Sequence, residues 1–327
     1  MNTQTKLAIV AITIVIPLAS VTVYQTNTNQ QFTNNDNSKL LAISSFNPLY
    51  EFSQIVGQEK VDVTLLVPVG VEPHDWEPTI KDVQKMHKSD FIIINGMGFE
   101  NWVDDLIENN YDGIIVDTST GISKIQSEEK HDEEKHDEEK HDEEKHDEEK
   151  HDEHDEHNHL LGDPHIWLNP VYAKIQVQNI ANAFSNSDPK NAQFYHTNAE
   201  EYNKKLDVLD SKIRTELSDC NSDFIAFHDA FSYFAQEYDL NQHTVLTTTD
   251  SHGEVTAKTL ENVISTAREL NIKIIFSEDT VNTKTSQIIA NEIGGKVLVL
   301  SPLEIVSEKN YISKMTQNLE NLKEALC

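Results

Sequence analysis

The chain has 327 residues, of which 56 are acidic, 26 are basic, 15 are histidines and only 2 are cysteines, and its formal net charge is −30. Such a polyanion would repel a nucleic-acid backbone, because proteins that bind duplexes need clusters of Lys and Arg to displace counterions. The length and the 37% hydrophobic content suit a globular protein with two domains of roughly 100 to 150 residues. The composition therefore excludes nucleic acid as a partner.

The N-terminal segment, residues 1–37, has the composition of an export signal or membrane anchor followed by a polar linker. An apolar run from Leu7 to Val23 follows Lys6, and a polar stretch follows the run. The run is at the lower edge of the length that spans a bilayer, so the sequence permits both an uncleaved anchor and a signal cleaved near Ala19. Lipid attachment is not expected, because no cysteine follows the run. We therefore expect an extracytoplasmic protein, in the periplasmic space or at the cell surface.

The only cysteines are Cys220 and Cys327. Outside the cytosol two cysteines can form a disulfide, but the sequence does not test their geometry. Both the paired and the free state are open at this point.

Residues 38–187 are predicted to form a first α/β lobe. Apolar runs suited to strands buried on both faces of a parallel sheet occur at 40–45, 63–67, 91–95 and 113–117. Amphipathic stretches typical of helices lie between them, at 48–56 and 80–88. Strand, crossover helix and parallel strand form the βαβ unit, and its repetition predicts an open α/β domain.

Residues 188–218 are predicted to form one long linking helix. Apolar residues recur at helical spacing from Phe194 onward, Asp188 is placed to cap the helix, and Pro189 suits its first turn. About 30 helical residues would span about 45 Å. A rod of this kind would restrict the relative movement of two lobes more than a pair of loop hinges.

Residues 219–327 repeat the pattern of the first lobe. The predicted strands are at 224–227, 244–247, 272–276 and 296–300, and the predicted helices are at 231–238, 256–270 and 284–293. The predicted fold class is therefore α/β, with two lobes that each contain a mostly parallel sheet flanked by helices, joined by one long backbone helix.

Residues 122–160 of the first lobe are expected to be a disordered loop rich in histidine and acid. Between 128 and 159 there are 18 Asp or Glu, 5 Lys and 8 His with no apolar residue, so this stretch alone carries −13. Without apolar side chains to bury, it cannot offset the entropy of ordering. Imidazoles interleaved with carboxylates also bind divalent transition metals weakly. The predicted auxiliary weak ligands are His131, His136, His141, His146, His151, His154, His157 and His159.

Three histidines outside this loop stand at positions suited to ligand binding. His74 follows the second predicted strand, His165 follows the acidic loop, and His228 ends the first strand of the second lobe. Ligands of open α/β sheets bind outside the carboxyl ends of the strands, so these side chains are expected to converge between the lobes. Glu278 and Asp279 also follow a predicted strand, and a carboxylate from this pair is the expected fourth ligand. Three imidazoles and one carboxylate suit tetrahedral zinc, whereas calcium and magnesium prefer oxygen ligands alone.

The remaining histidines carry less information. His87, His196 and His243 lack such a context and are predicted to be structural, whereas the sequence leaves the role of the loop residue His252 open. A zinc hydrolase would need an open coordination position and a general base. Neither a His-Glu-x-x-His motif nor a nucleophile elbow occurs. The protein is therefore predicted not to be an enzyme.

Five motifs are more specific than composition or spacing. They are VPVGVEPHDWEP at 67–78, NGMGFENW at 95–102, DPHIWLNP at 163–170, HDAFSYF at 228–234 and LSPLE at 300–304. In this order they resemble the metal-binding solute-binding proteins of zinc and manganese ABC importers, the cluster A-I family, over residues 38–327. The resemblance implies one metal site between two lobes and delivery of the ion to a membrane permease powered by an ATPase. Carried over to this sequence, the ligands are His74, His165, His228 and Glu278.

The resemblance favours zinc over manganese. Manganese members supply a carboxylate where His228 stands, and the His-rich insertion and the LSPLE ending resemble the zinc branch. More nitrogen ligands also favour zinc in the affinity order of divalent ions. The zinc branch fills the fourth place with a carboxylate or with water, so Glu278 and water are both open here.

The expected function is high-affinity capture of Zn²⁺ for an ABC importer. The expected partners are the permease and its ATPase subunit, and the membrane itself if the N-terminal segment is uncleaved. The protein is expected to be a monomer. An uptake protein for manganese or another divalent metal, and a surface zinc buffer or adhesion module, are the alternatives.

Overall fold

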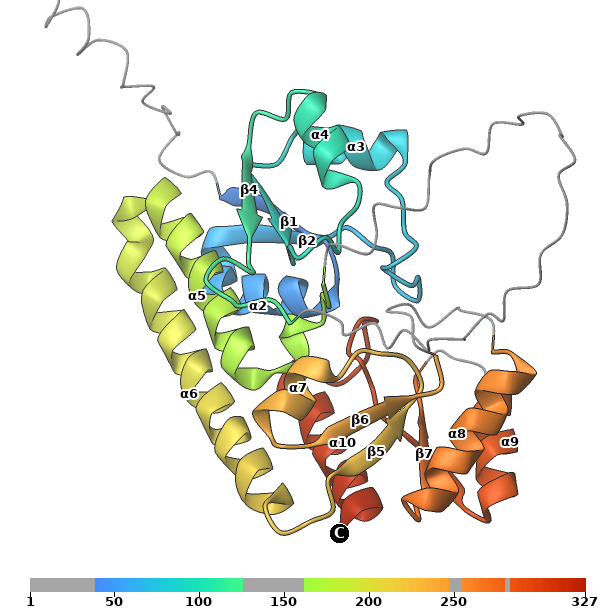
Figure 1. Ribbon diagram of the computed structural model, residues 1–327. Helices are drawn as coiled ribbons and strands as arrows, with labels where there is room; N and C mark the ends of the chain where they lie inside the picture. Colours follow the sequence, from blue (N-terminus) through green and yellow to red (C-terminus); the bar gives the residue numbers. More distant parts are fainter. Residues whose placement is uncertain (1–38, 126–161, 247–254, 280–282) are drawn as a thin grey trace, which may run out of the picture. The chain divides into compact units, whose positions relative to one another are not determined.

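Two four-stranded sheets organise the part of the chain that the computed structural model describes, which comprises residues 39–125, 162–246, 255–279 and 283–327. Helices flank both sheets, and a long helix connects the two lobes (Figure 1). The predicted fold class, with two α/β lobes joined by a long helix, is confirmed.

All neighbouring strands in both sheets run parallel. The first sheet has the order β2-β1-β3-β4 and the second has the order β6-β5-β7-β8. The strands are β1 Leu40–Ser44, β2 Val61–Leu65, β3 Phe91–Ile94, β4 Ile114–Asp117, β5 Asp223–Ala226, β6 Asn241–Thr244, β7 Ile274–Ser277 and β8 Lys296–Val299. In such sheets ligands bind where the strand order reverses, outside the carboxyl ends of the strands.

The helices cover these sheets and fill the space between them. The α-helices are α2 Asn47–Gly57, α3 Ile80–Met86, α4 Val103–Glu108, α5 Pro170–Ser187, α6 Ala192–Leu217, α7 Ser232–Glu237, α8 Ala257–Glu269, α9 Lys284–Ile293 and α10 Tyr311–Leu326. The short 3-10 helices are η1 Gln58–Lys60, η3 Ile166–Leu168 and η4 Pro189–Asn191. Of these, α4, α5 and α10 were not predicted from the sequence.

The linking helix differs from its predicted form. It is the second arm of a hairpin, because α5 precedes it and α6 begins only at Ala192, after the turn η4. Asp188 is the C-cap of α5, and its carboxylate accepts hydrogen bonds from the hydroxyl of Tyr195 at 2.9 Å and the amide of Asn191 at 2.6 Å. The side chain of Asp188 is therefore used to close the hairpin and does not cap the following helix.

Strand β6 lies three residues earlier than predicted. The prediction followed the apolar pair Val245 and Leu246, whereas the parallel pairing with β5 runs from Asn241 to Thr244. Because β6 is an edge strand, its polar residues remain partly exposed, and an apolar run does not mark it. His243 lies inside this strand and bonds Asp223 at 2.9 Å.

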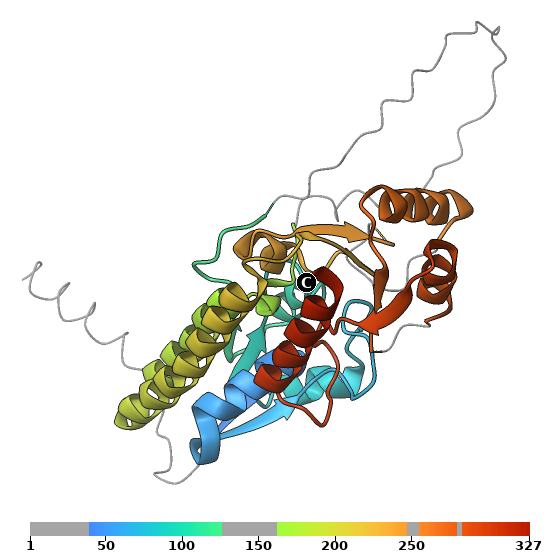
Figure 2. The same cartoon turned by 90° about the horizontal axis from the view of Figure 1, so that it is seen from below.

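One large apolar cluster extends from the first lobe through α6 into the second. The buried side of α6 follows a helical stripe that includes Tyr195, Tyr202, Leu206 and Ile213. One cluster of buried residues contains this stripe together with residues of α2, α5 and α10. Figure 2 shows α5 and α6 side by side over most of their length, with α10 running beside them. The two sheets are thus attached to one packed helical frame.

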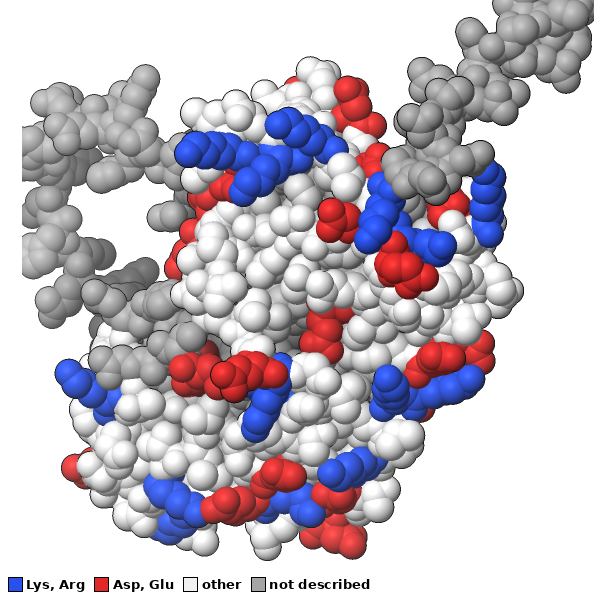
Figure 3. Space-filling view, turned by 180° about the vertical axis from the view of Figure 1, so that it is seen from behind, with Lys and Arg blue, Asp and Glu red and all other residues white. Residues whose placement is uncertain are grey.

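Charged side chains of both signs share the surface of this unit. On the face in Figure 3, basic groups stand next to acidic ones in small clusters separated by uncharged surface. Ion pairs such as Arg214 with Asp210, at 3.1 Å, neutralise charge locally. A large share of the formal charge belongs to the acidic insertion, as its count of −13 shows.

Several predictions fall outside the described residues. They concern the segment 1–37, the eight histidines of the insertion at 122–160, and His252. In the part of the chain that is described, no helix combines the length and the hydropathy needed to cross a membrane.

The second lobe is closed by a disulfide between Cys220 and Cys327, with the two Cα atoms 4.7 Å apart. Cys220 precedes β5 and Cys327 follows α10, so the bond joins the segment before the first strand of this lobe to the segment after α10. The amide of Asn221 also donates to the carbonyl of Leu326, which fastens the same two segments. The two cysteines are therefore paired, which answers the question that the sequence leaves open.

Replacing both cysteines by serine should lower the free energy of unfolding by about 3 to 4 kcal/mol, because the cross-link spans a long stretch of the unfolded chain. The sequence separation it closes is 107 residues. Urea unfolding of the oxidised protein and of the double variant measures the difference. Wild type treated with a reductant is the control and should behave as the variant does. An unchanged unfolding midpoint in the variant would contradict this account.

Candidate metal centre

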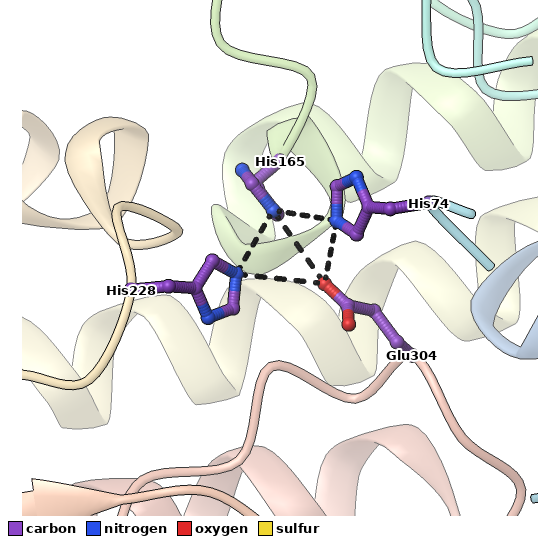
Figure 4. A group of neighbouring side chains, drawn as sticks. All are labelled: His74, His165, His228 and Glu304. Carbon is purple, nitrogen blue, oxygen red and sulfur yellow. Dashed lines mark hydrogen bonds and ion pairs between the residues drawn. The ribbon is translucent and has the colours of Figure 1, made fainter. Parts of the chain in front are cut away.

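Four side chains from distant parts of the chain point toward one another (Figure 4). His74 lies in the loop between β2 and α3, and His165 directly precedes η3. His228 lies two residues after β5, and Glu304 lies in the loop between β8 and α10. His74, His228 and Glu304 thus lie in loops that follow strands. His165 is held beside a strand end, because Asn95, directly after β3, donates to the carbonyl of Pro164. Open α/β sheets bind ligands in such places.

The ligand atoms of this group have the spacing of a tetrahedral metal site. The Nε2 atom of His165 lies 3.2 Å from that of His74 and 3.3 Å from that of His228. Oε1 of Glu304 lies 3.3, 3.5 and 3.9 Å from the Nε2 atoms of His74, His165 and His228. For zinc bonds of about 2.0 to 2.1 Å, the corners of a tetrahedron stand about 3.3 to 3.4 Å apart. The group therefore fits a zinc-sized cation with little rearrangement.

The group is almost enclosed by protein. His165 and His228 have no exposed surface, and Glu304 is 5% exposed. The His74 side chain retains 10% of its exposure, so it forms the side of the group nearest to solvent. Its ring meets Phe99 edge-on with centroids 4.7 Å apart, which orients it against the first lobe.

Two carboxylates orient histidine rings from outside the group. Nδ1 of His165 pairs with Asp163 at 2.7 Å, and Nδ1 of His228 pairs with Glu278 at 2.5 Å. Each carboxylate also accepts the backbone N–H of the histidine it holds. A proton on Nδ1 leaves Nε2 with a lone pair directed at the centre, which is the usual outer-shell arrangement for a metal-binding histidine.

The structure places Glu278, the predicted fourth ligand, behind His228 and outside the group. Strands β5 and β7 are neighbours, so a residue directly after β7 reaches the Nδ1 side of His228. Glu304 takes the fourth corner instead. Sequence reasoning used the LSPLE stretch at 300–304 only to distinguish zinc from manganese, although the same stretch contains the carboxylate. Because this loop follows the edge strand β8 by several residues, no strand-end rule indicated it.

The charges inside the group depend on one another. Burial lowers the pKa of His74 and so favours its neutral form. Burial also opposes a charge on His165, but Asp163 and Glu304 outweigh this effect and raise the pKa of His165 to about 10. Burial disfavours a charged Glu304 too, yet the three histidines hold the pKa of that carboxyl well below its usual value. A proton on His165 thus balances Glu304 until a cation displaces it.

Glu72 is a further, half-buried carboxyl close to the group. Burial, and then the negative charge of Glu304, raise the pKa of Glu72 to about 9. Its Oε1 atom is buried without a hydrogen-bond partner among the described residues. Glu72 therefore adds no negative charge beside the ligands near neutral pH.

The histidines predicted to be structural lie outside the group. His243 bonds Asp223, and His196 bonds Gln178 at 3.3 Å. The ring of His87 meets that of Tyr111 edge-on. Among the described residues, the group of His74, His165, His228 and Glu304 is the one whose ligand atoms all lie within 4.8 Å of one another.

Known proteins resemble this chain along most of its length. The family "ZnuA: Zinc-uptake complex component A periplasmic" matches residues 43–325. The chain is 38% identical over 298 residues to the high-affinity zinc uptake system protein ZnuA of Bacillus subtilis, with 88% of each chain covered. The Zn(II)-bound ZnuA-like domain of Streptococcus pneumoniae AdcA is 27% identical, with a TM-score of 0.72 over 88% of this chain and 99% of that one. The laminin-binding protein Lmb of Streptococcus agalactiae, described as bifunctional with adhesin and metal transporting activity, is 26% identical, with a TM-score of 0.73 over 88% and 99%.

Glu304→Gln should weaken zinc binding more than Glu278→Gln does. The first change removes the charge of an atom at a corner of the tetrahedron, whereas the second removes only the carboxylate that orients His228. Loss of an orienting partner costs about 10- to 100-fold in affinity, and we expect more than about 100-fold for the corner itself. Competition with a chromogenic chelator measures both affinities. A larger loss in Glu278→Gln would reverse the assignment of the two carboxylates.

Proposed function

The chain belongs to the family of periplasmic component A of zinc-uptake complexes, and we propose that it captures Zn²⁺ between His74, His165, His228 and Glu304. It then delivers the ion to the permease of an ABC importer. The observation that supports this proposal is the close, roughly tetrahedral spacing of four ligand atoms, three of which belong to buried residues. The ion is the cargo of the protein and has no catalytic role.

The ligand types favour zinc among the common divalent ions. Three imidazole nitrogens and one carboxylate oxygen are typical of zinc, whereas calcium and magnesium take six or more oxygen ligands. Manganese stands below zinc in the affinity order for nitrogen ligands. His228 contributes nitrogen at the third corner, so a manganese carrier is the weaker alternative.

The proposed partners follow from the family. Components of this family work with a membrane permease and an ATPase, and we assign the same partners to this chain. We further propose that it acts as a monomer outside the cytoplasm and that the apolar segment within residues 1–37 directs its export or anchors it. A surface buffer or adhesion module would work without such partners, so adjacent genes for a permease and an ATPase distinguish the two functions.

The site does not support hydrolysis. A catalytic zinc site keeps an open position for water and places a general base near it. Here protein atoms occupy all four corners, and the two carboxylates that orient ligand histidines from outside the group, Asp163 and Glu278, are engaged with ring nitrogens. We therefore propose that the protein is not an enzyme.

His165→Ala should abolish high-affinity zinc binding and growth in zinc-depleted medium. The variant loses the central imidazole, whose Nε2 contacts all three other corners. His243→Ala is the matched control, because His243 bonds Asp223 away from the group. Zinc titration of the purified proteins and zinc-limited growth of a complemented deletion strain are the measurements. Normal binding and growth with His165→Ala would refute the proposed site.

The His-rich insertion, which lies outside the described residues, is proposed to collect zinc for the central site. It is joined to the chain directly before residues 162–165, so ions held weakly on it would be tethered close to His165. Tethering raises effective concentration without adding contacts to the site. Deletion of 128–159 should therefore slow zinc loading and reduce the number of bound ions, while the affinity of the central site is unchanged. If loading rate, stoichiometry and growth in low zinc all equal those of wild type, the insertion has no such role.

A further inference from the structure

The loop that carries Glu304 contains a residue in an unfavourable backbone conformation. Leu303 has φ of 63°, in the left-handed region, and its side chain is buried at 3% exposure. This region is rarely occupied by a bulky residue, and such residues persist only where surrounding contacts fix them. Because Leu303 directly precedes Glu304, its backbone sets the direction of the carboxylate.

The contacts that fix this backbone come from other elements. Nε1 of Trp167 donates to the carbonyl of Pro302 at 2.7 Å, and Nδ2 of Asn47 donates to the carbonyl of Leu303 at 3.0 Å. The Leu303 carbonyl belongs to the peptide bond that leads into Glu304. Rotation of this peptide, and with it withdrawal of the carboxylate, therefore breaks the bond to Asn47.

Asn47 belongs to the helix of the first lobe that also holds the far end of the same loop. It is the first residue of α2, and one turn later Glu51 accepts the backbone N–H of Tyr311 at 2.7 Å. The hydroxyl of Tyr202 bonds the other oxygen of Glu51. Between these two ties, residues 307–310 are exposed and 305–306 are only half-buried. Helix α2 thus supports both ends of this loop, whose residues 305–310 are largely unburied.

We propose that Asn47 is a positioning residue for Glu304 and that its hydrogen bond to Leu303 slows the release of zinc. The proposal rests on the proposed function, in which Glu304 is a ligand of the transported ion. The hydrogen bond from Asn47 connects the Glu304 loop of the second lobe to the lobe that carries His74. Separation of α2 from this loop would therefore withdraw one ligand and open the tetrahedron on the second-lobe side.

A double-mutant cycle tests the proposal in the full chain. Zinc dissociation is measured by chelator capture in wild type, Asn47→Ala, Glu304→Gln and the double variant. Asn47→Ala should speed dissociation about 5- to 10-fold, which is the value of one hydrogen bond. In the Glu304→Gln background the same change should have no effect beyond about twofold, because the two residues act as one unit. Gln54→Ala is the control, since Gln54 lies on the same helix but bonds Tyr50.

A spectroscopic measurement separates positioning from general loss of stability. Co²⁺ accepts the same nitrogen and oxygen ligands, and its visible absorption depends on the coordination geometry. The spectrum of Asn47→Ala should shift toward that of Glu304→Gln, while the spectrum of Gln54→Ala matches wild type. If Asn47→Ala does not fold, Asn47→Asp, which keeps the shape but loses the donor, goes through the same cycle.

The outcomes distinguish this proposal from the function on which it rests. If wild type binds no zinc, or Glu304→Gln binds it as tightly as wild type, the proposed ligand set fails. If these two behave as expected but Asn47→Ala releases zinc at the wild-type rate, the positioning role alone is overturned. Equal acceleration by Asn47→Ala with and without Glu304 would also overturn it, because the residue would then act through the fold in general.

Discussion

The distance between ligand atoms is the constraint on which the rest of the structure depends. A tetrahedral zinc site needs four polar atoms within about 3.3 to 3.4 Å of one another, in an interior where unpaired polar groups are unfavourable. Here each atom is fixed by a different partner. Asp163 orients His165, Glu278 orients His228 and Phe99 packs edge-on against His74, while the loop of Glu304 is held through its backbone. The four corners are therefore prepared before the ion arrives, which reduces the cost of binding.

Such preparation requires a rigid frame, because the ligands are up to 230 residues apart in sequence. The continuous core around α6 supplies this frame. Packed interiors resist small displacements, so a shift of one lobe must disturb the helices that both lobes share. Loops alone would leave the two halves of the site free to separate. The hairpin of α5 and α6 therefore has a role that a single linking rod would fulfil less well, since both of its helices contact α2 of the first lobe.

The sequence predicted the parts of this arrangement that depend on local pattern. Apolar β-branched runs identified the inner strands, and strand-end positions led to His74, His165 and His228, which the structure brings together. The same rule led to Glu278, which follows a central strand but reaches only the outer nitrogen of His228. Glu304 reaches the centre from a loop whose course is fixed by Trp167 and other distant residues. Contacts of that kind depend on tertiary packing, and no local periodicity reports them.

The electrostatics of the centre explain why a cation and a proton exclude each other there. Glu304 is buried, and a buried carboxylate is tolerated only beside positive charge. In the metal-free protein His165 supplies that charge, since Asp163 and Glu304 overcome its burial and raise its pKa to about 10. Zinc requires the same imidazole to be neutral, so binding must release the proton. Protons are therefore direct competitors for the site, and acidification shifts the balance toward the metal-free form. The positive charge beside Glu304 thus comes from His165 in one state and from the ion in the other.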